Sequence, residues 1–367
     1  MSFFTPIAAE LERLHETALL REPRVAAPAG AADFASNDYL GVGRHPLVIA
    51  ALRARGRAGS GGSRLLGGAQ PEFSRLEAEL AVWTGREAAR LFSSGYLAAL
   101  GAIVTLGRFA AHARSDALVH ACAIDALRLT HCERAIFPHG TLAATAPDGE
   151  PTMVVTESVF SMDGDRAPLA AQLAALGPRD VLVVDEAHAL GVAGARGAGL
   201  AASLADPRIV VIGTLSKALG GAGGFVAGPA ALVALLGSAA RTFVYDTAPP
   251  PAVAAAASAA LAIVRGSEGD ALRARLERRT ALVRDGLAVR GVATAPGDGP
   301  IVVVPVGEDR AALALAARLA AAGIFAPAIR PPTVAAGTAR LRLVVRADHT
   351  AAQIDRLLAA FTAASDP

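Results

Sequence analysis

The chain has 367 residues, a formal net charge of +2 and 53% hydrophobic residues, while only 19% of its residues are charged. This composition excludes a largely disordered chain, and the balanced charge gives no general reason to bind nucleic acid or an anionic membrane. Two cysteines cannot form a disulfide framework. The uncharged stretch 247–264 contains three consecutive prolines and leaves too few residues to span a bilayer. We therefore expect a cytoplasmic globular protein with no membrane partner.

The chain begins with an amphipathic pattern. Apolar residues at near-helical spacing predict a short helix over 6–20, and Pro23 and Pro28 then interrupt the chain. A polar segment at 36–41 and a glycine-rich segment at 59–68 come next, and the pattern over 73–84 is helical.

Short apolar runs rich in β-branched residues then alternate with alanine-rich helical stretches. The runs at 89–92, 153–156, 181–184 and 209–212 are continuous, which is typical of strands buried on both faces. This alternation predicts an α/β fold with a mainly parallel sheet. After Pro249 the pattern changes to helices at 252–264, 268–289 and 310–321 and strands at 301–306 and 341–345, which predicts a small α+β domain.

The length allows two domains at about 100–200 residues each. We place an N-terminal helix and linker at residues 1–35, a large domain at 36–248 and a small C-terminal domain at 249–367, because the pattern changes at these points.

Polar residues follow two of the expected strands. Asp185 ends the run at 181–184, and Thr214, Ser216 and Lys217 follow the run at 209–212. Ligands of open α/β sheets bind at the carboxyl ends of the strands. Lys217 is one of very few lysines in a chain whose basic residues are almost all arginines. Only an amine with an accessible neutral form can make a Schiff base, so this lysine is a candidate for such chemistry.

An acid for a pyridinium nitrogen, a lysine for an imine and a phosphate cup together describe a site for pyridoxal 5'-phosphate (PLP). The cup is expected at 93–96, between the run that ends at Phe92 and a helical stretch at 97–104, because helix N-termini bind phosphate. An ordinary strand-to-helix turn would have the same pattern.

Two other interpretations of these motifs fail on the sequence. Residues 185–188 also spell a helicase box, but the chain lacks the G-x-x-x-x-G-K-[ST] loop that a helicase requires. His120 and His188 have no third ligand at a suitable spacing, so no metal site is expected.

Several segments together resemble the α-oxoamine synthases, PLP-dependent enzymes of the aspartate-aminotransferase fold type (fold type I). The segments are 36–41, 59–65, 155–165, 185–188, 214–217, 328–334 and 337–342, and they extend over nearly the whole chain. The resemblance implies a large domain with a mainly parallel seven-stranded sheet, a small α+β domain and a homodimer with the active site between subunits.

The last segments are most similar to family members that act in biotin biosynthesis. Those members condense L-alanine with a pimeloyl thioester, carried by CoA or an acyl carrier protein, and release CO2, free thiol and 8-amino-7-oxononanoate. The resemblance therefore implies this reaction and these substrates for the chain.

The resemblance also implies cofactor roles, residue by residue. Lys217 would form the imine with PLP and later remove the α-proton of alanine, Asp185 would pair with the pyridinium nitrogen, and His188 would bond the ring 3-oxygen. His120 would stack on the ring and polarise the carbonyl or orient the carboxylate. The remaining cofactor oxygens would be held by Gly95, Tyr96, Ser161, Thr214 and Thr247.

Four residues would meet the substrates by the same resemblance. Arg330 would hold the amino-acid carboxylate, which its guanidinium fork matches. Asn37 and Thr333 would also meet the substrate, and Arg21 would contact the acyl group. Asp246 departs from the family pattern, which commonly has serine there, in a segment that reaches the neighbouring subunit's phosphate in relatives.

Two alternative functions stay open. A relative that uses glycine, such as 2-amino-3-ketobutyrate CoA ligase or 5-aminolevulinate synthase, would share most motifs, although the segments over 328–342 argue against it. An inactive homologue that serves as a structural subunit is the other alternative. The presence of Lys217, Asp185 and His188 argues against it.

Overall fold

A computed structural model describes residues 2–21, 27, 30–141 and 149–362. Pro23 and Pro28, expected in the linker, lie outside these residues. The chain divides into a smaller compact unit, 1–36, 162–164 and 276–367, and a larger one, 37–161 and 165–275. The sequence-based limits of the domains remain a prediction; the compact units differ from them by joining residues 1–35 to the smaller unit and 249–275 to the larger.

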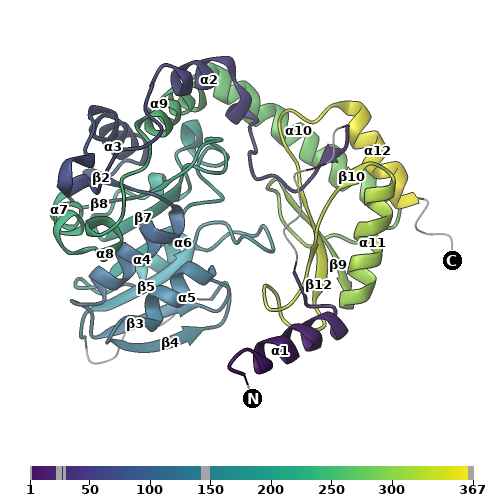
Figure 1. The fold of residues 1–367 in the computed structure, drawn as a ribbon, viewed down its shortest axis with the longest axis horizontal. Coiled ribbons are helices and arrows are strands. Elements are labelled where there is room, and N and C mark those ends of the chain that lie inside the picture. Colours follow the sequence, from purple (N-terminus) through teal and green to yellow (C-terminus); the bar gives the residue numbers. More distant parts are fainter. Residues whose placement is uncertain (1, 22–26, 28–29, 142–148, 363–367) are drawn as a thin grey trace. The chain divides into compact units, whose positions relative to one another are not determined.

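The larger unit contains, within the described residues, a seven-stranded sheet in the order β2-β8-β7-β6-β5-β3-β4 (Figure 1). Only β8 runs antiparallel to its neighbours; the other pairs described are parallel. This confirms the expected α/β fold with a mainly parallel sheet. The strands are β2 (Ala88–Phe92), β3 (His112–Asp116), β4 (Glu133–Phe137), β5 (Thr152–Glu157), β6 (Val181–Asp185), β7 (Ile209–Thr214) and β8 (Gly224–Gly228).

The central strands are buried because their residues are continuously apolar. Leu182, Val183 and Val184 of β6 have no solvent exposure, and every residue of β5 and β7 is buried. The register pairs Glu157 of β5 with Asp185 of β6 and Asp185 with Ile212 of β7. The carboxyl ends of the three strands therefore meet at one edge of the sheet.

Alanine-rich helices cover this sheet. Ala98 and Ala102 of α4 and Ala126 of α5 pack against Met153 and Val183 in one core cluster, and their small side chains let helices approach the strands closely. The helices of the larger unit are α2 (Pro46–Arg53), α3 (Pro71–Thr84), α4 (Gly95–Leu106), α5 (Ala121–Arg128), α6 (Leu169–Ala174), α7 (Ala230–Ala239), α8 (Arg241–Val244) and α9 (Pro251–Arg265).

The smaller unit has its own sheet, an antiparallel one in the order β11-β12-β9. These strands are β9 (Ile301–Gly307), β11 (Ala328–Ile329) and β12 (Ala339–Val344). Near the N-terminus, β1 (Ala32–Asp33) pairs in parallel with β10 (Ile324–Phe325), which explains why the first residues belong to this unit. Helices α11 (Asp309–Ala321) and α12 (Ala351–Thr362) complete it, and α10 (Ser267–Val289) contains the boundary at 275 and 276.

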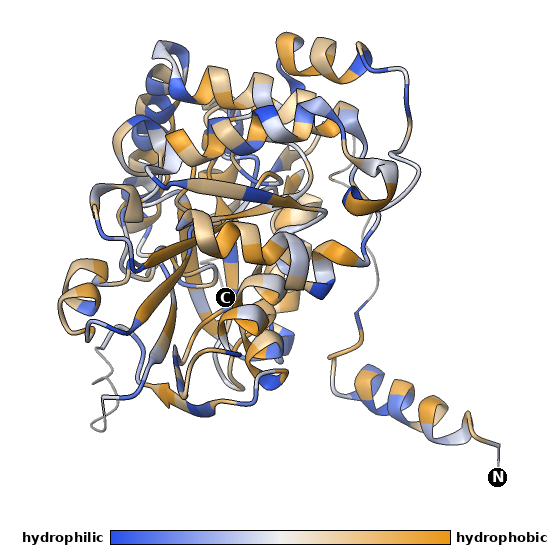
Figure 2. Ribbon diagram, turned by 90° about the vertical axis from the view of Figure 1, so that its left-hand side faces the viewer, coloured by the Kyte–Doolittle hydropathy of each residue, from blue (hydrophilic) through white to orange (hydrophobic). Residues whose placement is uncertain are grey.

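Helix α1 (Thr5–Glu16) has both polar and apolar residues along its length, as Figure 2 shows beside the N-terminal mark. Its Ile7 and Leu11 are about half exposed. No helix among the described residues is long and apolar enough to cross a membrane.

Candidate active site

A cavity of about 240 Å³ lies at the carboxyl ends of β5, β6 and β7 in the larger unit. The sequence predicted that polar side chains would gather at this edge, and the structure brings many of them together. The predicted residues that line the cavity are Gly95, Tyr96, His120, Ser161, Asp185, His188, Thr214 and Lys217.

A chain of hydrogen bonds runs from Lys217 into the core. Its Nζ lies 2.7 Å from Nε2 of His188, and Nδ1 of His188 lies 2.6 Å from the hydroxyl of the fully buried Tyr39. The Tyr39 hydroxyl donates to Oδ1 of Asn37 at 3.3 Å. With an ammonium at Lys217, each contact joins one donor to one acceptor. Tyr39 was not predicted from the sequence, because its part in the site comes from its contacts with His188 and Asn37.

Asp185 is the last residue of β6, and its Oδ1 accepts a hydrogen bond from the backbone N–H of Ala187 at 2.9 Å. This bond orients the carboxylate at the strand end. Lys217 follows β7, the neighbouring strand, so an acid and an amine line the same cavity from adjacent strand ends.

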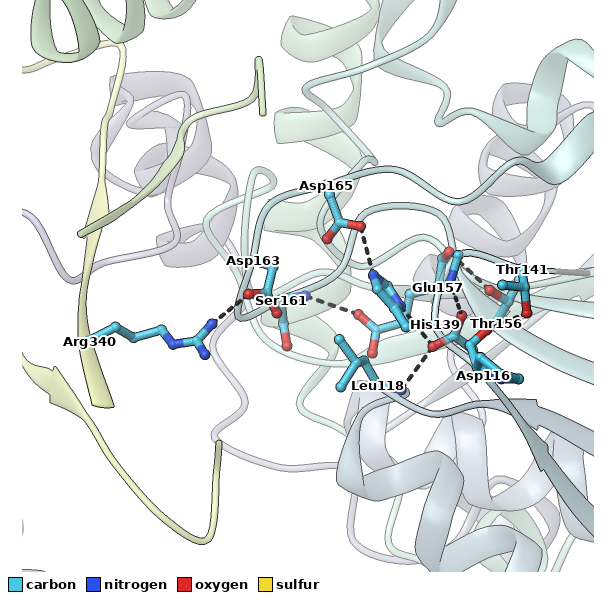
Figure 3. Close-up of polar contacts among 12 residues, drawn as sticks. Asp116, Leu118, His139, Thr141, Thr156, Glu157, Ser161, Asp163, Asp165 and Arg340 are labelled. Carbon is cyan, nitrogen blue, oxygen red and sulfur yellow. Dashed lines mark hydrogen bonds and ion pairs between the residues drawn. The ribbon is translucent and has the colours of Figure 1, made fainter. Parts of the chain in front are cut away.

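Glu157, the last residue of β5, is a second acid in the cavity and is only 3% exposed. Its Oε2 accepts a hydrogen bond from the backbone N–H of Ser161 at 3.2 Å (Figure 3). Burial and the nearby Asp185 raise the pKa of Glu157 to about 8, although Lys217 opposes the shift. Glu157 was not predicted from the sequence, although it ends a β-branched run just as Asp185 does.

The N-terminus of α4 borders the same cavity. Ser94 caps the helix, since its Oγ accepts a hydrogen bond from the N–H of Leu97 at 3.1 Å. A Cβ placed on Gly224 would lie 2.4 Å from the backbone nitrogen of Gly95, and one on Gly95 would lie 3.2 Å from Cβ of Thr214. A side chain at Gly224 would collide with this backbone, and one at Gly95 would crowd Thr214, so these two positions place no side chain over the start of the helix and Ser94 caps only the N–H of Leu97.

His120 caps α5, where its Nδ1 accepts a hydrogen bond from the N–H of Cys122 at 3.2 Å. The ring therefore carries its proton on Nε2 when it is neutral. Burial lowers the pKa of His120, and the charge on Lys217 acts in the same direction, against Asp185. These effects favour the neutral ring.

The remaining predicted residues lie outside this cavity. Thr247 is exposed, and its neighbour Asp246 accepts a hydrogen bond from the hydroxyl of Ser93. Arg21, Arg330 and Thr333 belong to the smaller unit, where they line a separate hollow of about 460 Å³. Arg21 donates to Oγ1 of Thr333 at 3.0 Å and to the carbonyl of Arg330 at 3.2 Å. Their contact with substrate remains a prediction.

Among the described residues, no group of three or more His, Cys, Asp or Glu side chains is arranged to hold a metal ion. The chemistry of the cavity is that of an amine, two carboxyl groups and two imidazoles.

A sequence-family model for aminotransferases of class I and II matches residues 30–361. The chain belongs to this family. It is 44% identical over 355 residues to an 8-amino-7-oxononanoate synthase of Burkholderia cenocepacia (strain HI2424). The matched region covers 91% of this chain and 86% of the relative. This membership confirms the family and the fold type that the sequence motifs predicted.

Two solved structures share the aminotransferase fold with this chain. A serine palmitoyltransferase from S. paucimobilis with a bound PLP–myriocin aldimine has a TM-score of 0.89 and 29% identity, and covers 98% of this chain and 97% of its own. An 8-amino-7-oxononanoate synthase from Francisella tularensis has a TM-score of 0.76 and 26% identity, over 92% of this chain and 98% of its own.

Proposed function

We propose that this chain is an 8-amino-7-oxononanoate synthase. It joins L-alanine to a pimeloyl thioester, carried by CoA or an acyl carrier protein, with release of CO2 and free thiol. The observation that carries this proposal is the cavity in which Lys217, Asp185 and His188 meet at the strand edge, in a chain whose relatives have that name.

The cavity fits PLP in its charge and in its backbone. Asp185 offers a carboxylate for a pyridinium nitrogen. The close packing of Gly95 and Gly224 keeps the N-terminus of α4 open to a phosphate. We assign His188 to the ring 3-oxygen and His120 to the ring face, and the other cofactor oxygens to Gly95, Tyr96, Ser161, Thr214 and Thr247.

PLP, when bound, supplies an electron sink for the negative charge left at the α-carbon of an amino acid. We assign Lys217 Nζ as the attachment point of the cofactor and, once released, as the base that takes the α-proton of alanine. His188 and Tyr39 hold Nζ at the strand edge through contacts of 2.7 and 2.6 Å. His120, with its proton on Nε2, donates to the substrate carboxylate or thioester carbonyl.

The substrate residues are assigned by their chemistry. We assign Arg330 to the alanine carboxylate, because its guanidinium fork matches that group. Thr333 lies near Arg330, since Arg21 donates hydrogen bonds both to the carbonyl of Arg330 and to the hydroxyl of Thr333. Arg21 is assigned to the pimeloyl group and Asn37, bonded to Tyr39, to the amino acid.

We further propose that the enzyme is a cytoplasmic homodimer. The larger unit has a hollow of about 550 Å³ lined by apolar residues of α4, with Leu129 and Tyr245 beside them. Leu129 and Tyr245 are 59% and 73% exposed, and exposed apolar patches of this kind are typical of protein interfaces. Light scattering would give twice the chain mass for a dimer, and a mass of one chain would refute it.

The reaction is tested with purified protein, PLP, L-alanine and pimeloyl-CoA or the pimeloyl carrier protein, with the amino-ketone product read by mass. Parallel reactions with glycine and short acyl-CoAs test the alternative substrates. We expect product with alanine and a pimeloyl thioester. Product only with glycine would refute the proposal, and so would a protein that binds no PLP.

A further inference from the structure

Glu157 is a buried acid to which the mechanism above gives no task. It ends β5, where the register pairs it with Asp185 of β6. Paired residues on adjacent strands project to the same face of a sheet, so two carboxyl groups lie side by side at the cavity. The side chain of Glu157 is 3% exposed.

The two oxygens of Glu157 have different surroundings. Oε2 accepts the hydrogen bond from Ser161, which Figure 3 shows on the loop after β5. Oε1 is buried in the lining of the cavity and makes no hydrogen bond of ordinary geometry with the described residues, while the backbone N–H of His120 also faces the carboxyl group. Buried polar atoms in folded proteins almost always have partners. An oxygen left over at the edge of a cavity therefore points to a group that binds there.

The charges around Glu157 decide its protonation. The groups that face it are Asp185 on β6, Lys217 after β7, the thiol of Cys122 on α5 and the backbone N–H groups of Ser161 and His120. Lys217 and the two N–H groups favour the carboxylate, but burial and Asp185 outweigh them. A second buried carboxylate beside Asp185 would add repulsion to the cost of burial, which a protonated carboxyl group avoids.

We propose that Glu157 is a neutral carboxylic acid that donates a hydrogen bond from Oε1 to an anionic oxygen of the bound cofactor. Asp185 then holds the single negative charge of the pair. A carboxyl group kept neutral by burial can donate at neutral pH. The identity of the acceptor rests on the proposed function, whereas the protonation state does not.

The donor role is tested by titrating the apoprotein with PLP. In Glu157→Gln the amide oxygen can accept from Ser161 while the NH2 group donates into the cavity. We expect this variant to bind PLP within about twofold of the native chain, and Glu157→Ala to bind about tenfold more weakly. Equal weakening in both variants would show that the negative charge is needed. Native affinity in Glu157→Ala would exclude the hydrogen bond.

The protonation state is tested without cofactor, so that its failure is separate from that of the proposed function. A carboxyl group whose pKa is raised by folding stabilises the protein fully below its unfolded pKa, and this stability is lost as pH rises toward about 8. We expect the Tm of the apoprotein to fall more between pH 5 and pH 9 in the native chain than in Glu157→Gln. The exposed Glu277, changed to Gln, is the matched control. An equal fall in the native chain and Glu157→Gln would overturn the proposal.

Discussion

The side-chain nitrogen of Lys217 lies 2.7 Å from Nε2 of His188. This contact ties the amine assigned to hold the cofactor to the imidazole assigned to its ring oxygen. Lys217 lies three residues after β7 and His188 three residues after β6, so their contact depends on the register of these two adjacent strands. Substitutions on either side of it give the first predictions.

Lys217→Ala removes the proposed attachment point. Lys217 is the only lysine among the 367 residues. A PLP adduct fixed by borohydride on a side-chain amine can therefore form only at this residue. We expect the native protein to gain the mass of reduced PLP on the peptide that contains residue 217, and the variant to gain none. Turnover should fall by about 10³-fold or more, since the base is lost with the anchor.

Lys217→Arg is the matched variant that keeps the positive charge. It should also form no reducible adduct, because a guanidinium has no accessible neutral form. An adduct at the N-terminal amine alone in the native protein would contradict the assignment of Lys217.

Tyr39→Phe removes the hydroxyl that contacts Nδ1 of His188 at 2.6 Å and Asn37 at 3.3 Å. We expect a loss of about 1–3 kcal/mol in the free energy of unfolding, because the buried His188 loses its hydrogen bond to this hydroxyl. The absorbance of bound PLP should also titrate at a different pH, since His188 loses its orientation. Urea unfolding and a pH titration of the spectrum measure these effects.

Ser74→Ala is the control, since it removes an exposed hydroxyl from α3. It should leave the unfolding free energy within about 0.5 kcal/mol of native. If the two variants behaved alike, the hydroxyl of Tyr39 would have no special role.

Asp246→Ser should strengthen PLP binding. Asp246 accepts a hydrogen bond from Ser93, which lies directly between β2 and the N-terminal cap of α4. A carboxylate close to a phosphate site repels the dianion by ~1 kcal/mol, so its removal should lower the dissociation constant of PLP by about fivefold at low salt. The effect should shrink as salt is added.

Asp246→Asn and Asp246→Glu separate charge from hydrogen bonding. Asp246→Asn should bind PLP as tightly as Asp246→Ser does, because both remove the charge. Asp246→Glu keeps the charge, so its affinity for PLP should stay as weak as that of the native chain. Weaker binding in Asp246→Ser would instead mean that the acid supports the cup through Ser93.

His139→Asn should destabilise the protein more at pH 6 than at pH 9. His139 contacts Asp116 at 2.9 Å through Nδ1 and Asp165 at 2.8 Å through Nε2 (Figure 3). Burial lowers the pKa of His139, but the two carboxylates outweigh it, and the net direction is upward. The stabilisation is therefore complete below the unfolded pKa and is lost as pH rises through the folded pKa.

We expect a difference of about 1–2 kcal/mol between the native chain and His139→Asn at pH 6, measured by urea unfolding. The exposed His131, changed to Asn, should show little difference at either pH. A His139→Asn effect that is the same at pH 6 and pH 9 would show that the ring does not donate to both carboxylates.

The central strands could be predicted from the sequence because burial on both faces leaves a continuous apolar pattern. The runs at 153–156, 181–184 and 209–212 became β5, β6 and β7 almost residue for residue. Strand β8 was missed because Gly224 and Gly228 have low strand propensity, and it is held there by pairing with β2 and β7. Strand β4 was missed because four of its five residues are exposed.

The residues of the candidate site could be predicted where the side chain itself indicates the chemistry. Lys217 and Asp185 follow apolar runs and carry groups that few other residues replace. Glu157 ends a β-branched run as Asp185 does, so the same argument from strand ends could have found it. Tyr39 contacts the site only through His188, which is distant in sequence, so no local pattern points to it. The hollow that contains Arg21, Arg330 and Thr333 likewise joins the two ends of the chain.

The division of the chain bears on how the enzyme can be dissected. The backbone passes from one unit to the other after residues 36, 161, 164 and 275. No single cut in the gene separates the two units into independently encoded halves. A fragment that ends at 275 would lack the body to which residues 162–164 belong, so we expect limited proteolysis or gene truncation to yield insoluble pieces rather than two working modules.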